Sequence, residues 1–167
     1  MGISAYLRRI REHVGHDLIL MPAVSVLVWD TQGRVLLVRE AETGRWQTVG
    51  GSIEPDEDPY SAALREAREE AGVDVRIDRI RTVLGGAQYR LVYPNGDVVS
   101  YVSIVFDASI VAGTPAPDGD ETTETGWFAP DELGRVVLSA FTVELLKDAL
   151  NNRTPHLERP NAASGGA

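Results

Sequence analysis

The most informative stretch of the chain, residues 51–73, reads GSIEPDEDPYSAALREAREEAGV. Within it, residues 59–71 are predicted to form a helix. Asp58 suits the N-cap, Pro59 suits the first helical position, and Gly72 suits the residue just past the end. Local residues therefore predict where this helix begins and where it ends.

Three glutamates of this helix share one face. Glu66, Glu69 and Glu70 are spaced i, i+3 and i+4, so their carboxylates repel one another, and Arg65 can pair with only part of that charge. Carboxylate oxygens are hard ligands that suit Mg²⁺, Mn²⁺ or Ca²⁺. The pattern predicts a divalent-cation site, although three glutamates alone would also fit a solvated acidic face.

The other face of the helix consists of small residues. Ala63, Ala67 and Ala71 allow close packing, which would hold the glutamates rigidly. The glycines at 50–51 let the preceding loop pass near the helix without a Cβ clash. Glu57, near the helix start, can accept backbone N–H groups or help to hold a metal.

The spacing of glycine, glutamate and arginine in residues 51–73 resembles the Nudix box. Every glycine and charged position of that pattern matches; Ala67 replaces the usual bulkier aliphatic residue, and Asp56 stands where many relatives have glycine. The resemblance extends over about residues 22–150. It implies an α/β (α+β) fold in which a mixed β-sheet is flanked by helices.

The resemblance also implies an activity: metal-dependent hydrolysis of a pyrophosphate bond in a nucleoside diphosphate derivative or nucleoside triphosphate. The implied cofactor is Mg²⁺, with Mn²⁺ as an alternative, and the implied substrate is a small nucleotide rather than a nucleic-acid polymer. The implied metal ligands are Glu57, Glu66, Glu69, Glu70 and Glu121. The implied catalytic residues are Arg65, Glu66, Glu70 and Glu121.

Some of these roles stay open at this point. By resemblance, Arg65 orients a box glutamate, and the general base is Glu70, Glu66 or a carboxylate from the loop before Trp127. For that loop carboxylate Glu121 is the first choice and Glu124 the second; both also fit solvated loop acids.

Candidate substrate contacts come from the strands around the box. Arg39, Arg45 and Arg90 offer forked guanidinium donors for phosphate or ribose, although each also fits an ordinary surface arginine. Trp46 is a candidate for stacking on a base, and Tyr89 and Tyr101 share that chemistry. Aromatic residues in a β-rich region are also typical of a hydrophobic core.

The composition of the whole chain fits one globular domain. Its 167 residues carry a formal net charge of −9, which argues against non-specific nucleic-acid binding. The chain has no cysteine, and its apolar runs are far shorter than the ~20 residues of a membrane span. We expect a single domain over residues 1–150, a flexible tail over 151–167, a cytoplasmic location and no membrane partner.

The remaining elements are predicted from periodicity and turn chemistry. A short amphipathic helix is expected at 4–13 and a closing helix at 139–150. Hairpins are expected to join 23–29 with 34–39 and 88–93 with 98–108. Residues 44–58 and 113–125 are expected to be loops, 127–128 a short strand, and 129–133 a capped helical turn.

Two alternatives to the hydrolase belong to other functional classes. A Nudix-fold sensor would bind a nucleotide metabolite without cleaving it. The complete set of box glutamates argues against a sensor, because a protein that only binds needs no complete metal site. A Nudix-fold isomerase acting on an isoprenoid diphosphate calls for a cysteine in the site, and the chain has none. Many members of the family are dimers, so a homodimer is a further expectation.

Overall fold

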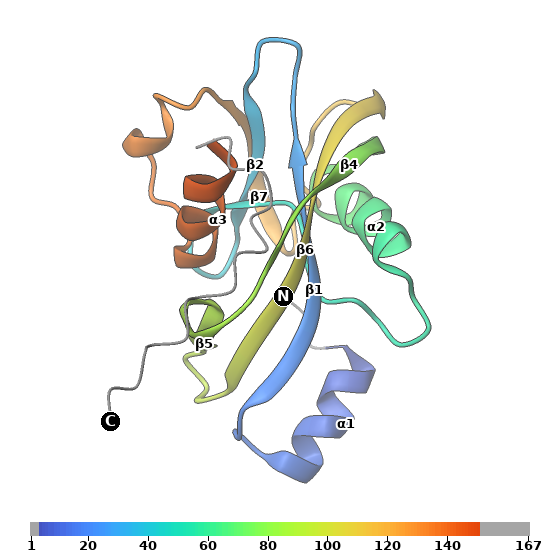
Figure 1. Cartoon of the computed structure of the whole chain (residues 1–167), viewed down its shortest axis with the longest axis vertical. Coiled ribbons are helices and arrows are strands. Elements are labelled where there is room, and N and C mark those ends of the chain that lie inside the picture. Colours follow the sequence, from blue (N-terminus) through green and yellow to red (C-terminus); the bar gives the residue numbers. More distant parts are fainter. Residues whose placement is uncertain (1–3, 151–167) are drawn as a thin grey trace, which may run out of the picture.

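The structure is a computed structural model that describes residues 4–150, with side chains up to residue 147 (Figure 1). These residues form two β-sheets with helices around them. The helices are α1 (Ala5–Val14), α2 (Pro59–Ala71), α3 (Ala140–Leu150) and the short 3₁₀ turns η1 (Ala87–Tyr89) and η2 (Leu133–Arg135). The strands are β1 (Ile19–Val28), β2 (Val35–Glu40), β3 (Trp46–Thr48), β4 (Asp74–Leu84), β5 (Arg90–Val92), β6 (Val98–Ala112) and β7 (Thr122–Phe128).

The first sheet is mixed, as predicted. Its strand order is β1-β6-β4, and β5 pairs with the start of β6. Strand β1 runs parallel to β6, whereas β4 and β5 run antiparallel to it. Three register shifts interrupt the pairing of β4 with β6, which bends this edge strand.

The predicted hairpin of residues 23–29 and 34–39 is wrong as a strand pair. The turn forms, since Asp30 N–H donates to Arg34 O, but only the bridge between Trp29 and Val35 joins the two segments. Strand β1 then enters the first sheet, and β2 enters a second sheet of order β3-β2-β7. Burial explains this separation. The last six residues of β1 are all buried, so both faces of this strand must be covered by other elements, which a two-stranded hairpin with β2 cannot provide.

Helix α2 has the predicted bounds. The Asp58 carboxylate accepts hydrogen bonds from the N–H groups of Tyr60 and Ser61, and Gly72 ends the helix in the left-handed conformation with φ of 65°. Its four buried alanines pack on β1 and β4. Small side chains therefore set the close approach of the glutamate-bearing helix to the first sheet.

The other predictions differ from the structure mainly at element ends. The predicted loop 44–58 contains the short strand β3. The predicted loop 113–125 ends at residue 121, because β7 begins at Thr122. Residues 88–89 form η1 rather than a strand, and the helical turn after Ala129 shifts to η2. Ser139 precedes α3, and its hydroxyl accepts a hydrogen bond from Thr142 N–H. The predicted tail, 151–167, lies outside the described residues.

Two hydrophobic clusters divide the core. One cluster packs the alanines of α2 against residues of both sheets, and the other joins residues of both sheets to Leu145 and Leu146 of α3. In Figure 1, α2 and α3 stand on opposite sides of the sheets. Within residues 4–150, no helix is long and apolar enough to cross a bilayer.

Asp107 is a buried carboxylate that joins β6 to β4. It accepts hydrogen bonds at 2.6 Å from Arg79 Nε and Arg81 Nε and at 2.9 Å from Trp29 Nε1. Burial opposes its ionisation, but the hydrogen bonds outweigh burial and hold the pKa of Asp107 below its usual value. The folded state is therefore stabilised by ionised Asp107 above the pKa of the unfolded chain, and this contribution is lost as the pH falls.

We expect Asp107→Asn to lower the free energy of unfolding by about 2 kcal/mol at pH 7, allowing for the exposure of Arg79. The difference from wild type should shrink below about pH 4, where the unfolded carboxyl is protonated. Thermal melts between pH 3 and pH 8 measure this. Asp131→Asn, at an exposed position, controls for the change in net charge. A difference that does not vary with pH would contradict the assignment.

Candidate active site

Glu70, in the last turn of α2, is the most buried carboxylate of the glutamate cluster, with 2% of the residue exposed. Its Oε2 accepts a hydrogen bond of 2.9 Å from the N–H of Gly50. Burial raises the pKa of Glu70 well above its usual value despite that hydrogen bond, and the charges of Glu66, Glu121 and Asp118 raise it further. Glu70 is thus a carboxylate that readily accepts a proton.

Glu66 lies one turn earlier on the same face and is also buried. Burial raises its pKa, and the neighbouring Arg65 guanidinium offsets only part of that effect. The loop before α2 makes room for it, because a Cβ on Gly51 would collide with the Glu66 carboxylate. The two glycines therefore contribute differently. Gly50 donates its N–H to Glu70, and Gly51 leaves room for the Glu66 carboxylate because it has no Cβ.

Arg65 links the remaining glutamates. Its Nε and Nη2 donate to both oxygens of Glu57, each at 2.9 Å. Its Nη1 donates to Glu66 at 2.8 Å and to Glu69 at 2.9 Å, and Nη2 also reaches the carbonyl of Ser52. These bonds lower the pKa of Glu57 and raise that of Arg65 above its usual range. Arg65 stays charged and fixes the loop to the helix.

The two loop glutamates have different surroundings. Glu124 lies on β7 opposite Arg39 of β2, and their side chains form an ion pair of 2.6 Å. Glu121 precedes β7, and its negative charge raises the pKa of both Glu66 and Glu70. Charge from Glu121 therefore acts on the cluster, whereas Glu124 pairs across the second sheet.

The predicted substrate contacts lie in different parts of the fold. Arg39 and Trp46 are cross-strand neighbours on the second sheet, where Arg39 also lies opposite Glu124, and Trp46 packs edge-on against Phe128 at 4.8 Å between ring centroids. Arg45 is exposed in the loop before Trp46. Arg90 is exposed on β5, which lies apart from α2 in Figure 1. The structure does not bring Arg90 to the glutamates.

Asp118 and Thr122 were not predicted, although both shape the loop that carries Glu121. Asp118 Oδ1 accepts the N–H groups of residues 120, 121 and 122 at 2.8–3.0 Å. Thr122 is buried, and its hydroxyl donates to the carbonyl of Glu70 at 2.9 Å. The signal was present in the sequence as Asp-Gly-Asp-Glu-Thr, a pattern typical of a side-chain-stabilised turn.

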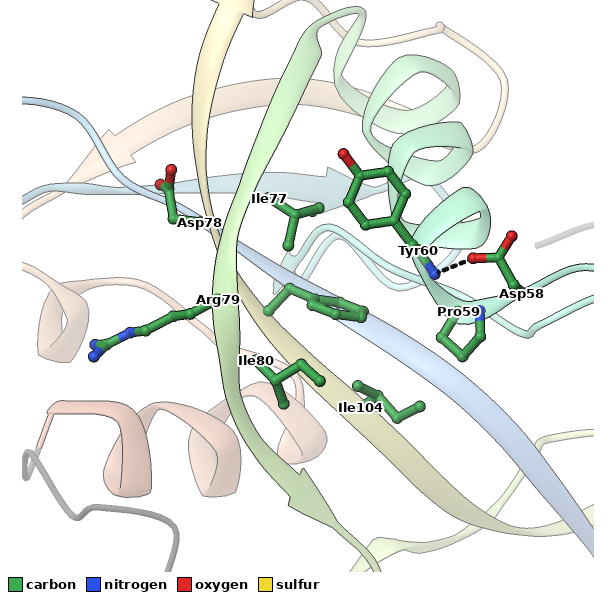
Figure 2. Close-up of a pocket in the computed structure, with 9 residues that line it drawn as sticks. Asp58, Pro59, Tyr60, Ile77, Asp78, Arg79, Ile80 and Ile104 are labelled. Atoms are coloured by element: carbon green, nitrogen blue, oxygen red, sulfur yellow. Dashed lines mark hydrogen bonds between the residues drawn. The ribbon is translucent and has the colours of Figure 1, made fainter.

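A pocket lies beside the start of α2 (Figure 2), and its volume is about 430 Å³. Its lining residues are Asp58, Pro59, Tyr60, Ile77, Asp78, Arg79, Ile80, Ile104 and Phe106. The wall is largely apolar, and the Arg79 side chain points away from it toward its partner Asp107. None of the lining residues belongs to the glutamate cluster, so this pocket does not suit a diphosphate.

The chemistry of the glutamate cluster fits a divalent cation. Glu66, Glu69, Glu70 and Glu121 offer only hard oxygen donors, and their mutual repulsion is what a cation relieves. Within residues 4–150, no group of three or more carboxylate or histidine side chains is arranged closely enough to hold one metal ion. Arg65 donates hydrogen bonds to Glu66 and Glu69, which offsets part of their negative charge.

Comparison with known proteins gives a consistent result. Residues 19–149 match the family model described as NUDIX domain. A MutT-like protein of Streptomyces ambofaciens is 31% identical over 135 residues, which cover 81% of this chain and 80% of the relative. An isopentenyl-diphosphate Delta-isomerase of Clavibacter michiganensis is 32% identical over 157 residues, covering 90% and 78%. An RNA pyrophosphohydrolase of Marinomonas sp. is 29% identical over 155 residues, covering 83% and 92%.

Solved structures show the same fold. The crystal structure of the MutT protein from Methanosarcina mazei matches with a TM-score of 0.66 over 82% of this chain and 99% of the other. The two sequences are 23% identical, so this likeness concerns the fold alone. It confirms the predicted mixed α+β architecture.

Proposed function

The chain belongs to the NUDIX domain family, and on that premise we propose that it hydrolyses a pyrophosphate bond in a small nucleoside diphosphate derivative or nucleoside triphosphate with a divalent cation. One observation carries the proposal: Glu66 and Glu70 are buried side by side, with raised pKa values, while Glu121 adds further negative charge. Burying such like charges is costly unless a cation is part of the working site.

We assign the proton-accepting role to Glu70. Its Oε2 is held by the N–H of Gly50, so Oε1 is the atom we propose to take the proton from the attacking water. The water oxygen then bonds to phosphorus, the bridging P–O bond breaks, and the leaving phosphate oxygen takes up the proton from Glu70, which returns to a carboxylate. The hydrogen bond from Gly50 N–H also fixes the orientation of the carboxylate, which supports this assignment.

Glu66, Glu69 and Glu121 are the proposed metal ligands, together with Glu70. Mg²⁺ is the proposed ion and Mn²⁺ the alternative, because both prefer oxygen donors. When bound, the ion neutralises phosphate charge and makes water more acidic. Glu57 was predicted as a ligand, but both its oxygens bind Arg65, which supports a role in positioning the arginine.

The relatives raise two other substrate classes. Some are named as isomerases of isopentenyl diphosphate and some as RNA pyrophosphohydrolases. The net charge of −9 and the acidic segment 118–124 beside the site favour a small nucleotide over an RNA polymer. Cytoplasmic location and homodimer formation stay predictions.

A substrate panel with product identification by mass spectrometry tests the proposal. The arms are nucleoside triphosphates, nucleotide sugars, dinucleotides, 5′-triphosphorylated RNA and isopentenyl diphosphate, each with Mg²⁺, Mn²⁺ or a chelator. We expect turnover of at least one small nucleotide with a metal and none with the chelator. Tight binding without turnover on every arm would favour the sensor, and rearrangement of isopentenyl diphosphate without phosphate release would favour the isomerase.

A further inference from the structure

The loop before β7 is fastened to the end of the glutamate-bearing helix. The N–H of Ala116 donates to the carbonyl of Ala71 at 3.0 Å. A Cβ on Gly113 would meet the carbonyl of Gly72 at 2.8 Å, so the two segments are already in close contact. The last carbonyls of a helix have no hydrogen-bond donor within the helix, and this loop supplies donors to those of α2.

Thr122 makes the second of these connections. Its hydroxyl donates to the carbonyl of Glu70 at 2.9 Å and accepts from the N–H of Asp118 at 3.2 Å. Thr122 is 1% exposed, so water cannot replace either bond when the hydroxyl is removed. One side chain thus joins the backbone of Glu70 to both ends of the turn that carries Glu121.

The turn itself is held on two further sides. Asp118 Oδ1 accepts hydrogen bonds from three backbone N–H groups, including that of Glu121 at 3.0 Å. The carbonyl of Glu121 accepts the N–H of Ala41, from the segment that follows β2, at 2.9 Å. The backbone of Glu121 is therefore fixed before any ligand binds.

We infer that Thr122 is a positioning residue that sets Glu121 against Glu66 and Glu70 through the bridge from its hydroxyl to the Glu70 carbonyl. The inference rests on the proposed function, because it gives Glu121 a place among the metal ligands. Valine at 122 would keep the shape and the strand but remove the bridge, whereas serine would keep the hydroxyl.

The test compares Thr122→Val and Thr122→Ser with Thr142→Val. Thr142 is an equally buried threonine whose hydroxyl accepts from Thr48 N–H, away from the glutamates, so it controls for the loss of a buried hydroxyl. The readouts are kcat and KM on the best substrate of the panel, the Kd for Mn²⁺ alone by electron paramagnetic resonance, and Tm.

We expect Thr122→Val to lower kcat and to weaken Mn²⁺ binding by about 10–100-fold each, with KM nearly unchanged. Thr122→Ser should stay within about threefold of wild type, and so should Thr142→Val even though its Tm falls by a similar amount. A Thr122→Val protein that matches Thr142→Val in both kcat and Mn²⁺ affinity would overturn the inference.

A second variant keeps the test decisive if Thr122→Val does not fold. Asp118 is exposed, so Asp118→Ala removes the three turn hydrogen bonds without opening a cavity, and the same direction of change is expected. Asp118→Asn keeps an acceptor oxygen but loses the charge that acts on Glu70, so it controls for that charge and should stay near wild type. Failure of the proposed function would look different. Wild type would then bind Mn²⁺ more tightly than both variants but turn over no substrate.

Discussion

Glu70→Gln is expected to lower kcat by about a thousandfold while leaving the protein at least as stable as wild type. Glutamine cannot accept the proton from water, and it offers a weaker oxygen to a cation. Its neutral amide suits a site that is 2% exposed better than a carboxylate does, and its oxygen still accepts the N–H of Gly50. Steady-state kinetics and thermal melts measure the two effects.

Glu144→Gln is the matched control for this experiment. Glu144 lies on α3 and forms a surface ion pair with Lys147, so neither kcat nor Tm should change by much. Full activity of Glu70→Gln would contradict the proposed role of Glu70 as the proton acceptor. A fall of Tm by many degrees would instead show that the carboxylate is needed for folding.

Gly50→Ala is expected to lower the free energy of unfolding by about 3 kcal/mol, which corresponds to a Tm lower by about 10 °C. Gly50 has φ of 149°, a conformation that residues with a Cβ rarely adopt. A Cβ there would collide with the carbonyl of Val24 and lie 2.9 Å from the Cα of Ser25. Both neighbours are backbone atoms of β1, so neither can turn away.

Gly134→Ala is the control, because a Cβ at Gly134 meets nothing within 4 Å and its φ is not positive. That variant should keep the Tm of wild type within about 1 °C. Activity of Gly50→Ala should also fall, because the clash would shift the backbone N–H that binds the Glu70 carboxylate. Equal Tm values for the two alanine variants would contradict the close approach of the 50–51 loop to β1.

The sequence predicted α2 to the residue because the signals are local. Asp58, Pro59 and Gly72 each act within one turn of the helix end. The first hairpin failed for the opposite reason: β1 pairs in parallel with β6, whose residues lie about eighty positions later, and turn chemistry at 30–33 carries no information on that partner.

The site was predicted in part. Helix periodicity grouped Glu66, Glu69 and Glu70, but only the packed structure shows that Glu66 and Glu70 are buried while the Glu69 side chain is 57% exposed. The proposed preference for Glu121 over Glu124 draws on the register of β2 with β7, which places Glu124 opposite Arg39. That register depends on residues far apart in the chain, and no local pattern encodes it.

The most direct test of metal-dependent hydrolysis at this site is the fate of the oxygen of water. The best substrate of the panel is turned over in ¹⁸O-labelled water with Mg²⁺, and the products are weighed by mass spectrometry. We expect one ¹⁸O atom per cleavage in a phosphate product, with no product when a chelator is present. Unlabelled products, or equal turnover with the chelator, would contradict it.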